Sequence, residues 1–374
     1  MTAAAVSAPT DWRRDFPLLA GRAHLSGCSL PPRWRGIEDA MAGMLATMAE
    51  APAPWHVFEE AVETARQRFA ELVHARPEQI AVLPAATVAG YQVLSVQDWT
   101  ARSGLVGTEA DFPSISQVFG AQEARGVERG FVADPLSVES WRAAVTERTG
   151  LVSVPLATYL HGSRPPVAEV CRLADEVGAR SFVDAYQGAG VLPIDVEELG
   201  CDYLVAGSNK YLLGLPGVVF LYSRDPGADA RTPQLTGWMG RDGAAMFDPY
   251  ATEPAGTARR YEIGTPPIPS VLSVSAGLAL INEIGVPAIA EHVGRLRDRL
   301  AAGAEGLRLV GHRPGEAHGA HLAFEIADPE RIAAELAGEG IFVSPRGPVV
   351  RVALHLYNTE QDVDRVLVAL RERS

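Results

Sequence analysis

The sequence predicts an α/β protein with a mainly parallel sheet covered by helices on both faces, followed by a smaller α/β domain. Between residues 80 and 223, short apolar runs alternate with amphipathic segments of roughly ten residues, a pattern typical of strands joined by crossover helices. A stretch rich in Gly, Pro and Arg at 225–269 separates this part from the helices and strands after residue 270. With 374 residues, the chain is long enough for two domains.

The expected elements follow the chain in order. We expect a frayed tail at 1–10, an arm at 11–32, and helices at 33–50 and 55–74 that are separated by a Pro-Ala-Pro break. The periodicity then predicts strands at 80–83, 105–108, 127–132, 151–157, 181–184, 203–206 and 218–223, and helices at 88–99, 117–125, 138–148 and 167–177. In the last part we expect helices at 270–283, 287–304, 329–338 and 359–371, and strands at 307–311, 321–326, 341–344 and 349–354.

Composition excludes several classes of protein. The net charge of −13 argues against binding to nucleic acid or to an anionic membrane, since both require clustered positive charge. Cys28, Cys171 and Cys201 lie far apart, have no metal-binding spacing and indicate reduced thiols. No apolar run approaches the ~20 residues of a membrane span, and no signal-peptide core is visible, so we expect a cytoplasmic protein without a metal.

Lys210 is the only lysine in the chain, in which every other basic residue is arginine or histidine. An amine can lose its proton and form an imine with an aldehyde, whereas a guanidinium stays protonated. Biased coding in a GC-rich genome is the alternative explanation for a lone lysine. The position of Lys210 favours a functional role, because it follows an apolar strand at 203–206 and precedes a glycine-rich turn at 212–217.

Asp184 ends the neighbouring apolar run, and we expect it to emerge at the same edge of the sheet as Lys210. An aspartate under a pyridine nitrogen and a lysine that forms an imine are the two groups with which proteins use pyridoxal phosphate (PLP) as an electron sink. Upstream, the strand at 80–83 leads through small residues into a helix. This turn offers free backbone N–H groups to a phosphate, although alone it is a weak signal.

Five motifs resemble those of PLP-dependent enzymes of the class V aminotransferase family, which includes cysteine desulfurases, kynureninases and isopenicillin N epimerase. They are VDAYQ, SNKYLLGLPGVVFLY, TGWMG, RYEIGTPPI and RVALHLYNTEQDVD. The resemblance covers nearly the whole chain and implies fold type I, in which a large domain with a mainly parallel, seven-stranded sheet binds the cofactor. It also implies an N-terminal arm at 1–32 that joins the small domain, a large domain at 33–270, a small domain at 271–374, and a homodimer with shared active sites.

The resemblance gives each matching position a role. Lys210 would be the Schiff-base lysine and would move the α-proton, and Asp184 would pair with the pyridinium nitrogen. Arg351 would grip the substrate carboxylate through its planar guanidinium. The other cofactor-binding positions are Gln187 at the ring 3-hydroxyl, Phe112 stacked on the ring, Ala86, Thr87, Ser208 and Asn209 at the phosphate, and Trp238 and Thr265 reaching the neighbouring subunit's cofactor.

Simpler alternatives exist for several of these residues. Phe112 also fits a core position, Trp238 a loop filler, and Arg351 a surface strand. His161 is a candidate substrate-binding residue, with an ordinary loop histidine as the alternative, and the role of Tyr159 stays open. Gln187 stands where relatives have histidine. No cysteine follows Cys201, so we do not expect the persulfide chemistry of cysteine desulfurases, which needs a thiol in the second half of the chain.

The resulting prediction is a PLP-dependent enzyme that acts on an α-amino acid. We prefer a lyase that cleaves a C–S or C–C bond of a modified, cysteine-like substrate, because Phe112 and the TGW and GTPP motifs resemble kynureninase. By association only, the Arg-rich composition indicates a GC-rich bacterium with secondary metabolism such as antibiotic biosynthesis. The alternatives are a true aminotransferase or epimerase, and an inactive cofactor-binding partner protein. The intact set of Lys210, Asp184, Gln187 and Arg351 argues against the last of these.

Overall fold

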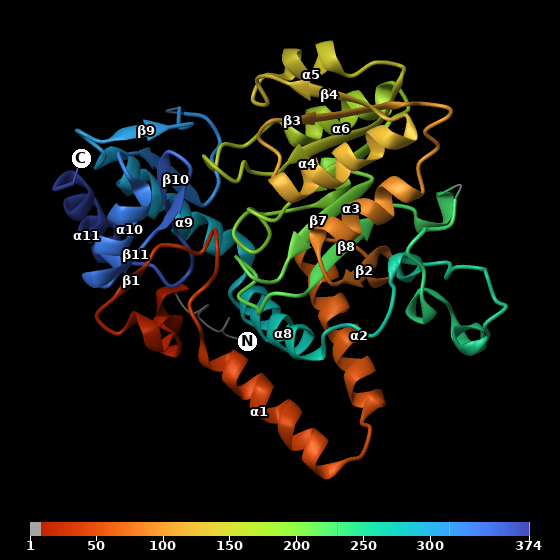
Figure 1. The fold of residues 1–374 in the computed structure, drawn as a ribbon. Coiled ribbons are helices and arrows are strands. Elements are labelled where there is room, and N and C mark those ends of the chain that lie inside the picture. The colour runs from red at the N-terminus through yellow and green to blue at the C-terminus, as the bar shows by residue number, and fades with distance from the viewer. Residues whose placement is uncertain (1–8, 230, 314, 374) are drawn as a thin grey trace, which may run out of the picture.

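The computed structural model describes residues 9–229, 231–313 and 315–373, and the chain folds around one large sheet (Figure 1). Residues 1–8 of the expected tail and arm lie outside the described residues. Seven strands form the large sheet in the order β2 (Ile80–Leu83), β8 (Val219–Ser223), β7 (Tyr203–Gly207), β6 (Arg180–Asp184), β5 (Thr149–Pro155), β3 (Gly104–Thr108) and β4 (Glu128–Val132). The predicted mainly parallel, seven-stranded sheet is therefore confirmed.

β8 is the one strand of this sheet that runs against its neighbours. It pairs antiparallel with both β7 and β2. The connection from β7 to β8 carries Lys210 and contains no helix, and a parallel return of the chain needs a crossover of roughly a dozen residues or more. The Lys210 loop is consequently a hairpin connection at the carboxyl end of β7.

Four helices between strands follow the prediction, but several of them are shorter. They are α3 (Ala86–Ser95), α4 (Pro113–Gly120), α5 (Val138–Ala144) and α6 (Val167–Glu176). The short α7 (Val196–Leu199), between β6 and β7, was not predicted. The helix expected at 117–125 begins earlier, because Pro113 occupies the first helical position, and continues as a separate 3-10 helix that ends at the left-handed Gly126.

Three long helices pack on one another beside the sheet. They are α1 (Arg35–Glu50), α2 (Trp55–Leu72) and α8 (Ile268–Ile284), and α8 contacts both of the others. α8 is apolar and contributes ten buried residues to the core. Among the described residues, no single helix is long and apolar enough to span a bilayer. α8 passes that test only together with α9 (Val286–Ala302), and the chain bends by 82° between the two.

A second, antiparallel sheet lies in the C-terminal part of the chain, drawn in blue in Figure 1. Its strand order is β12 (Ser344–Arg346), β13 (Val349–Ala353), β10 (His321–Glu325) and β9 (Arg308–Val310), and it is accompanied by α9, α10 (Pro329–Gly338) and α11 (Glu360–Arg371). The single strand expected at 341–344 is instead divided between two sheets. β11 (Ile341–Phe342) pairs with β1 (Ala23–His24) of the N-terminal arm, so the arm contacts the C-terminal part.

Candidate active site

Asp184 and Lys210 meet at the carboxyl end of the large sheet, as the sequence predicts. β6 pairs in parallel with β7, and Asp184 lies opposite Val205. Both side chains line a cavity of about 420 Å³, to which Phe112, Gln187 and Arg351 also contribute. This volume is typical of a site for a small organic ligand. Residues from both sheets therefore converge on one cavity.

The loop that follows Lys210 is fixed by contacts from three sides. The indole N–H of Trp34 donates to the carbonyl of Leu213 at 3.2 Å, and His355 Nε2 lies 3.0 Å from the carbonyl of Tyr211. Gly277 of α8 lies directly against the carbonyl of Leu212, where a β-carbon would come within 2.1 Å of the oxygen. These contacts hold Lys210 at a defined position in the cavity.

Two aromatic rings face the Lys210 amine. Its Nζ lies 4.5 Å from the centre of the Tyr186 ring and 5.3 Å from the centre of the Phe112 ring. The Tyr186 ring occupies the space above Gly207, where a β-carbon would overlap it, and the Tyr186 hydroxyl donates to Asn209 Oδ1 at 2.9 Å. Burial lowers the pKa of Lys210 from 10.5 to about 8, although the neighbouring Asp184 raises it. The amine therefore loses its proton far more easily than an exposed lysine.

Asp184 is 6 % exposed, and its Oδ1 accepts a hydrogen bond of 2.9 Å from the backbone N–H of Tyr186. Burial raises the pKa of this carboxyl, while the Tyr186 N–H and the charge of Lys210 lower it. A buried carboxylate with one fixed oxygen is well suited to hold a proton on a neighbouring ring nitrogen.

The first turn of α3 forms another wall of the cavity. Ala86 and Thr87 line it, and Ala85 occupies the N-cap position without any side chain that caps the helix. The backbone N–H groups at this end are thus available to an anion. Asn209 also lines the cavity, whereas the hydroxyl of Ser208 donates to the carbonyl of Leu215 and does not line it.

Two side chains in this cavity carry buried polar atoms that lack a partner among the described residues. Gln187 donates from Nε2 to the carbonyl of Cys28 at 3.1 Å, but its Oε1 is unpaired. Arg351 is 2 % exposed and donates to the carbonyl of Tyr159 at 2.7 Å and to Ser344 Oγ at 2.6 Å, while its Nε is unpaired. Because buried polar atoms are normally paired, these two suit a ligand that offers both a hydroxyl and an anionic group.

Ser208, predicted at the phosphate, thus lies outside this cavity, and so do three other predicted site residues. His161 is half-buried next to Gly311, and burial lowers its pKa. Trp238 and the exposed Thr265 line a separate small surface pocket beside Trp55 of α2. A single copy of the chain therefore does not bring Trp238 and Thr265 to Lys210, and the roles assigned to all three stay predictions.

The sequence reasoning missed three residues that line this cavity and one buried carboxyl near Asp184. Cys28, Tyr186 and Arg346 line the cavity, and Asp111 is a buried carboxyl whose pKa rises to about 8 through burial and the nearby Asp184. Tyr186 lies within the VDAYQ motif and could have been found there. Nothing in the sequence around Cys28 indicates that this thiol reaches the same cavity.

Comparisons with known proteins agree with this geometry. The family model described as aminotransferase class-V matches residues 50–366. The chain belongs to this family. An uncharacterized aminotransferase, YcbU, of Bacillus subtilis is 34 % identical over 95 % of both chains, and a kynureninase of Pseudomonas fluorescens is 26 % identical over 90 % of this chain and 85 % of its own. The structure of a cystine C-S lyase, C-DES, with its product cysteine persulfide superposes with a TM-score of 0.86 at 21 % identity, covering 96 % of this chain and all of the other.

As a class V enzyme, the protein depends on pyridoxal phosphate, and the residues present fit this cofactor. The uncapped start of α3 suits its phosphate, and the buried Asp184 suits its ring nitrogen. The unpaired Oε1 of Gln187 would accept from the ring hydroxyl, and Lys210 would supply the amine that binds the aldehyde. The fold type I architecture and the cofactor predicted from the sequence are both confirmed.

The lowered pKa of Lys210 predicts how this class V enzyme takes up its cofactor. Only the neutral amine attacks the aldehyde, so binding of PLP to cofactor-free enzyme is expected to accelerate with rising pH and to level off above about 8. Stopped-flow absorbance across the pH range would measure this midpoint. A rate that continues to rise toward the ordinary lysine value of 10.5 would contradict the burial of the amine.

Arg351 is expected to control substrate binding rather than the chemical step. Arg351→Ala removes a guanidinium whose position is fixed by Tyr159 and Ser344, and should raise KM for an α-amino acid by about 30-fold or more, with a smaller change in kcat. Arg351→Lys keeps the charge but loses the planar, bidentate geometry of the guanidinium. Its affinity for the substrate should therefore lie between those of Arg351→Ala and wild type. A loss in kcat with no change in KM in the Arg351→Ala variant would contradict this role.

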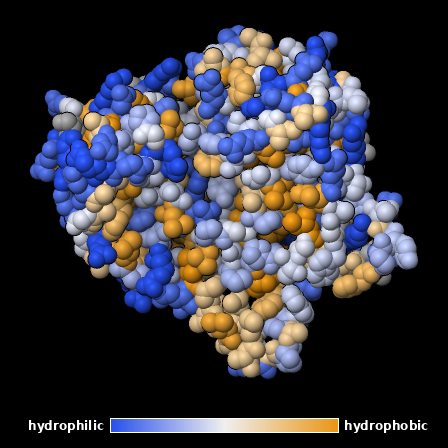
Figure 2. Space-filling view, in the orientation of Figure 1, coloured by the Kyte–Doolittle hydropathy of each residue, from blue (hydrophilic) through white to orange (hydrophobic). Residues whose placement is uncertain are grey.

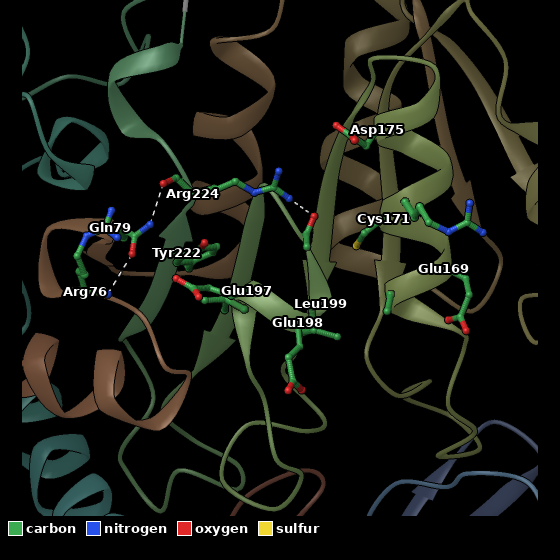
Figure 3. Close-up of a pocket in the computed structure, with 14 residues that line it drawn as sticks. Arg76, Gln79, Glu169, Cys171, Asp175, Glu197, Glu198, Leu199, Tyr222 and Arg224 are labelled. Atoms are coloured by element: carbon green, nitrogen blue, oxygen red, sulfur yellow. Dashed lines mark hydrogen bonds between the residues drawn. The ribbon is translucent and has the colours of Figure 1, made fainter.

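A larger groove of about 760 Å³ lies at the opposite end of the strands and is lined by Arg76, Gln79, Glu197, Glu198 and Arg224, among others (Figure 3). Gln79 donates to the carbonyl of Arg224 at 2.7 Å across it. Arg224 follows the last residue of β8, which pairs with the first residue of β7. This end of the strands is opposite to the one that carries the Lys210 loop. Size alone therefore does not identify the active site.

Proposed function

We propose that this class V enzyme acts on an α-amino acid and that its reaction is a lyase reaction, in which a C–S or C–C bond of a cysteine-like side chain is cleaved. The observation that carries the proposal is the convergence of Lys210, Asp184 and Arg351 on one cavity. An amine, a ring-nitrogen partner and a carboxylate clamp are the groups needed to hold an amino acid at its α-carbon.

Each residue has a separate task in this proposal. Arg351 binds the substrate carboxylate, and the Lys210 amine takes the proton from the α-carbon, which its lowered pKa allows near neutral pH. Asp184 keeps the cofactor nitrogen protonated. When bound, PLP supplies an electron sink that stabilises negative charge at the α-carbon. Phe112 and Tyr186 cover Lys210 and limit its contact with water.

For a C–S substrate, the proton taken from the α-carbon ends on the sulfur that leaves. Lys210 passes that proton to the thiolate as the bond from Cβ to sulfur breaks. One water then converts the remaining fragment to pyruvate and ammonia. The name of the similar C-DES structure, a cystine C-S lyase, supports this class of reaction, and the similarity to kynureninase supports the C–C alternative.

A single-turnover experiment distinguishes this reaction from transamination. A lyase returns its visible cofactor absorbance after one turnover without added keto acid and releases pyruvate or another keto product. An aminotransferase loses that absorbance until a keto acid is added, and this is the alternative favoured by the name of the Bacillus subtilis relative.

An epimerase would exchange the α-proton with solvent deuterium without releasing a fragment. Inertness toward a broad amino-acid panel, with PLP bound, would favour the partner-protein alternative. A role in secondary metabolism rests on composition alone and stays a prediction.

We also propose a homodimer in which Trp238 and Thr265 complete the partner's site. The end of the molecule formed by α1 and the start of α2 is apolar in Figure 2, and Leu45, Met48 and Trp55 are each more than half exposed there. Trp238 and Thr265 lie beside Trp55. Sedimentation equilibrium is expected to give twice the chain mass, and a fully active monomer would contradict the proposal.

A further inference from the structure

The N-terminal arm brings a thiol into the cavity that contains Lys210. Cys28 is 1 % exposed, and it lines this cavity together with Lys210 and Arg351. It lies close enough to the lysine that a negative charge on its sulfur would raise the pKa of the Lys210 amine. The reaction proposed above does not use this thiol.

The backbone around Cys28 is held by both parts of the chain. The N–H of Leu25 donates to the carbonyl of Phe342 at 2.7 Å, and the N–H of Ala353 donates to the carbonyl of Leu25 at 2.8 Å. From the large sheet, Gln187 Nε2 donates to the carbonyl of Cys28 itself. A thiol on such an anchored segment has a fixed position and cannot swing out to deliver sulfur to an acceptor outside the cavity.

The other two cysteines provide a contrast. All three cysteines belong to the hydrophobic core, but Cys171 and Cys201 do not line the cavity that contains Lys210. Burial raises the pKa of both thiols, to about 12 for Cys171. Their burial is explained by packing alone, since a free cysteine behaves as a small apolar residue. Cys171 lines the groove at the opposite end of the strands, and Cys28 is the cysteine that lines the cavity of Lys210.

Two unpaired buried atoms belong to side chains that line the same cavity as Cys28, and they suit a polar ligand there. Gln187 Oε1 and Arg351 Nε are both unpaired among the described residues, both belong to side chains less than one-tenth exposed, and both side chains line this cavity. In the proposed function, Arg351 binds the carboxylate of the substrate and Lys210 reaches its α-carbon. A residue that neighbours Lys210 in the same cavity lies within reach of the substituents on that carbon.

We infer that Cys28 is a specificity-determining residue whose thiol contacts the side chain of the bound amino acid and favours sulfur-containing or apolar groups over polar ones. The inference rests on the proposed action on an α-amino acid. A sulfur atom is polarisable and a weak hydrogen-bond partner, so it stabilises another sulfur or a methyl group better than a hydroxyl or ether oxygen.

Matched substrates and variants test this inference. S-methyl-L-cysteine and O-methyl-L-serine differ at one position, which is sulfur in the first and oxygen in the second. Binding of each compound to the holoenzyme is measured by the change in cofactor absorbance. Wild type is expected to prefer the sulfur compound, and Cys28→Ser to reduce that preference by about threefold to tenfold. Cys28→Leu narrows the cavity and should weaken both ligands by about tenfold or more, in KM rather than kcat. Unchanged affinities and preference in both variants would overturn the inference.

Two further measurements separate this inference from the proposed function. Borohydride reduction should attach the cofactor to Lys210 equally in wild type and both variants, because Cys28 has no part in that bond. If wild type binds its cofactor but no amino acid changes its absorbance, the proposed function fails instead.

Whether Cys28 lines the cavity is then tested by alkylation with iodoacetamide. The carbon of this reagent forms a bond to the thiolate sulfur as iodide leaves, and the thiol proton passes to solvent. Mass mapping should find Cys28 labelled before Cys171 and Cys201, and equal resistance of all three would overturn the inference.

Discussion

Lys210→Ala is expected to abolish the visible absorbance of the bound cofactor and to reduce turnover by at least about a thousandfold. The variant removes the amine that holds the cofactor aldehyde and, with it, the base that moves the α-proton. No second lysine exists in the chain to replace it. Absorbance spectra and kcat on any active amino acid measure the two losses separately.

Lys210→Arg is the matched control for this prediction. It keeps a positive charge beside Asp184 but cannot form an imine, so it should be as inactive as the alanine variant. Glu198→Ala, in the groove at the other end of the sheet, should retain wild-type spectra and rates. Borohydride trapping followed by peptide mapping should place the cofactor on Lys210 alone. Visible absorbance or a full rate in Lys210→Ala would contradict the assignment.

The sequence predicted best those features that depend on local patterns. Asp184 and Lys210 each follow an apolar strand, and parallel neighbouring strands end at the same edge of a sheet, so their proximity followed from the order of the elements. The predicted large sheet holds for the same reason, because helices between strands force the parallel direction. The direction of β8 depends instead on the length of one connection, which an apolar pattern does not reveal.

Contacts between distant parts of the chain were not predictable from patterns. Gln187 and Cys28 are 159 positions apart, and their hydrogen bond depends on how the N-terminal arm is anchored to the C-terminal sheet. The split of the strand at 341–344 has the same origin, since β11 pairs with the arm while β12 pairs with β13. The roles that the resemblance gives to Trp238 and Thr265 require a second copy of the chain, so a single chain does not test them.

Asp184→Asn is expected to lower kcat by roughly a hundredfold to ten-thousandfold while the cofactor stays attached to Lys210. Asparagine has nearly the same shape and can still accept the hydrogen bond from the Tyr186 N–H, so the local fold should persist. It carries no negative charge and cannot keep the cofactor nitrogen protonated, which removes most of the electron sink. Steady-state kinetics and borohydride labelling of Lys210 measure the two properties independently.

The same variant makes a second prediction whose sign follows from the charges. Asp184 raises the pKa of Lys210 and so opposes the lowering caused by burial. Without that carboxylate, the Lys210 pKa should fall further, and the pH midpoint for cofactor uptake should move below about 8. Asp195→Asn, which changes a carboxylate that caps α7 far from the cavity, should alter neither kcat nor the midpoint. A slow Asp184→Asn enzyme with an unshifted midpoint would mean that the aspartate acts through packing, because its charge would then not reach the amine.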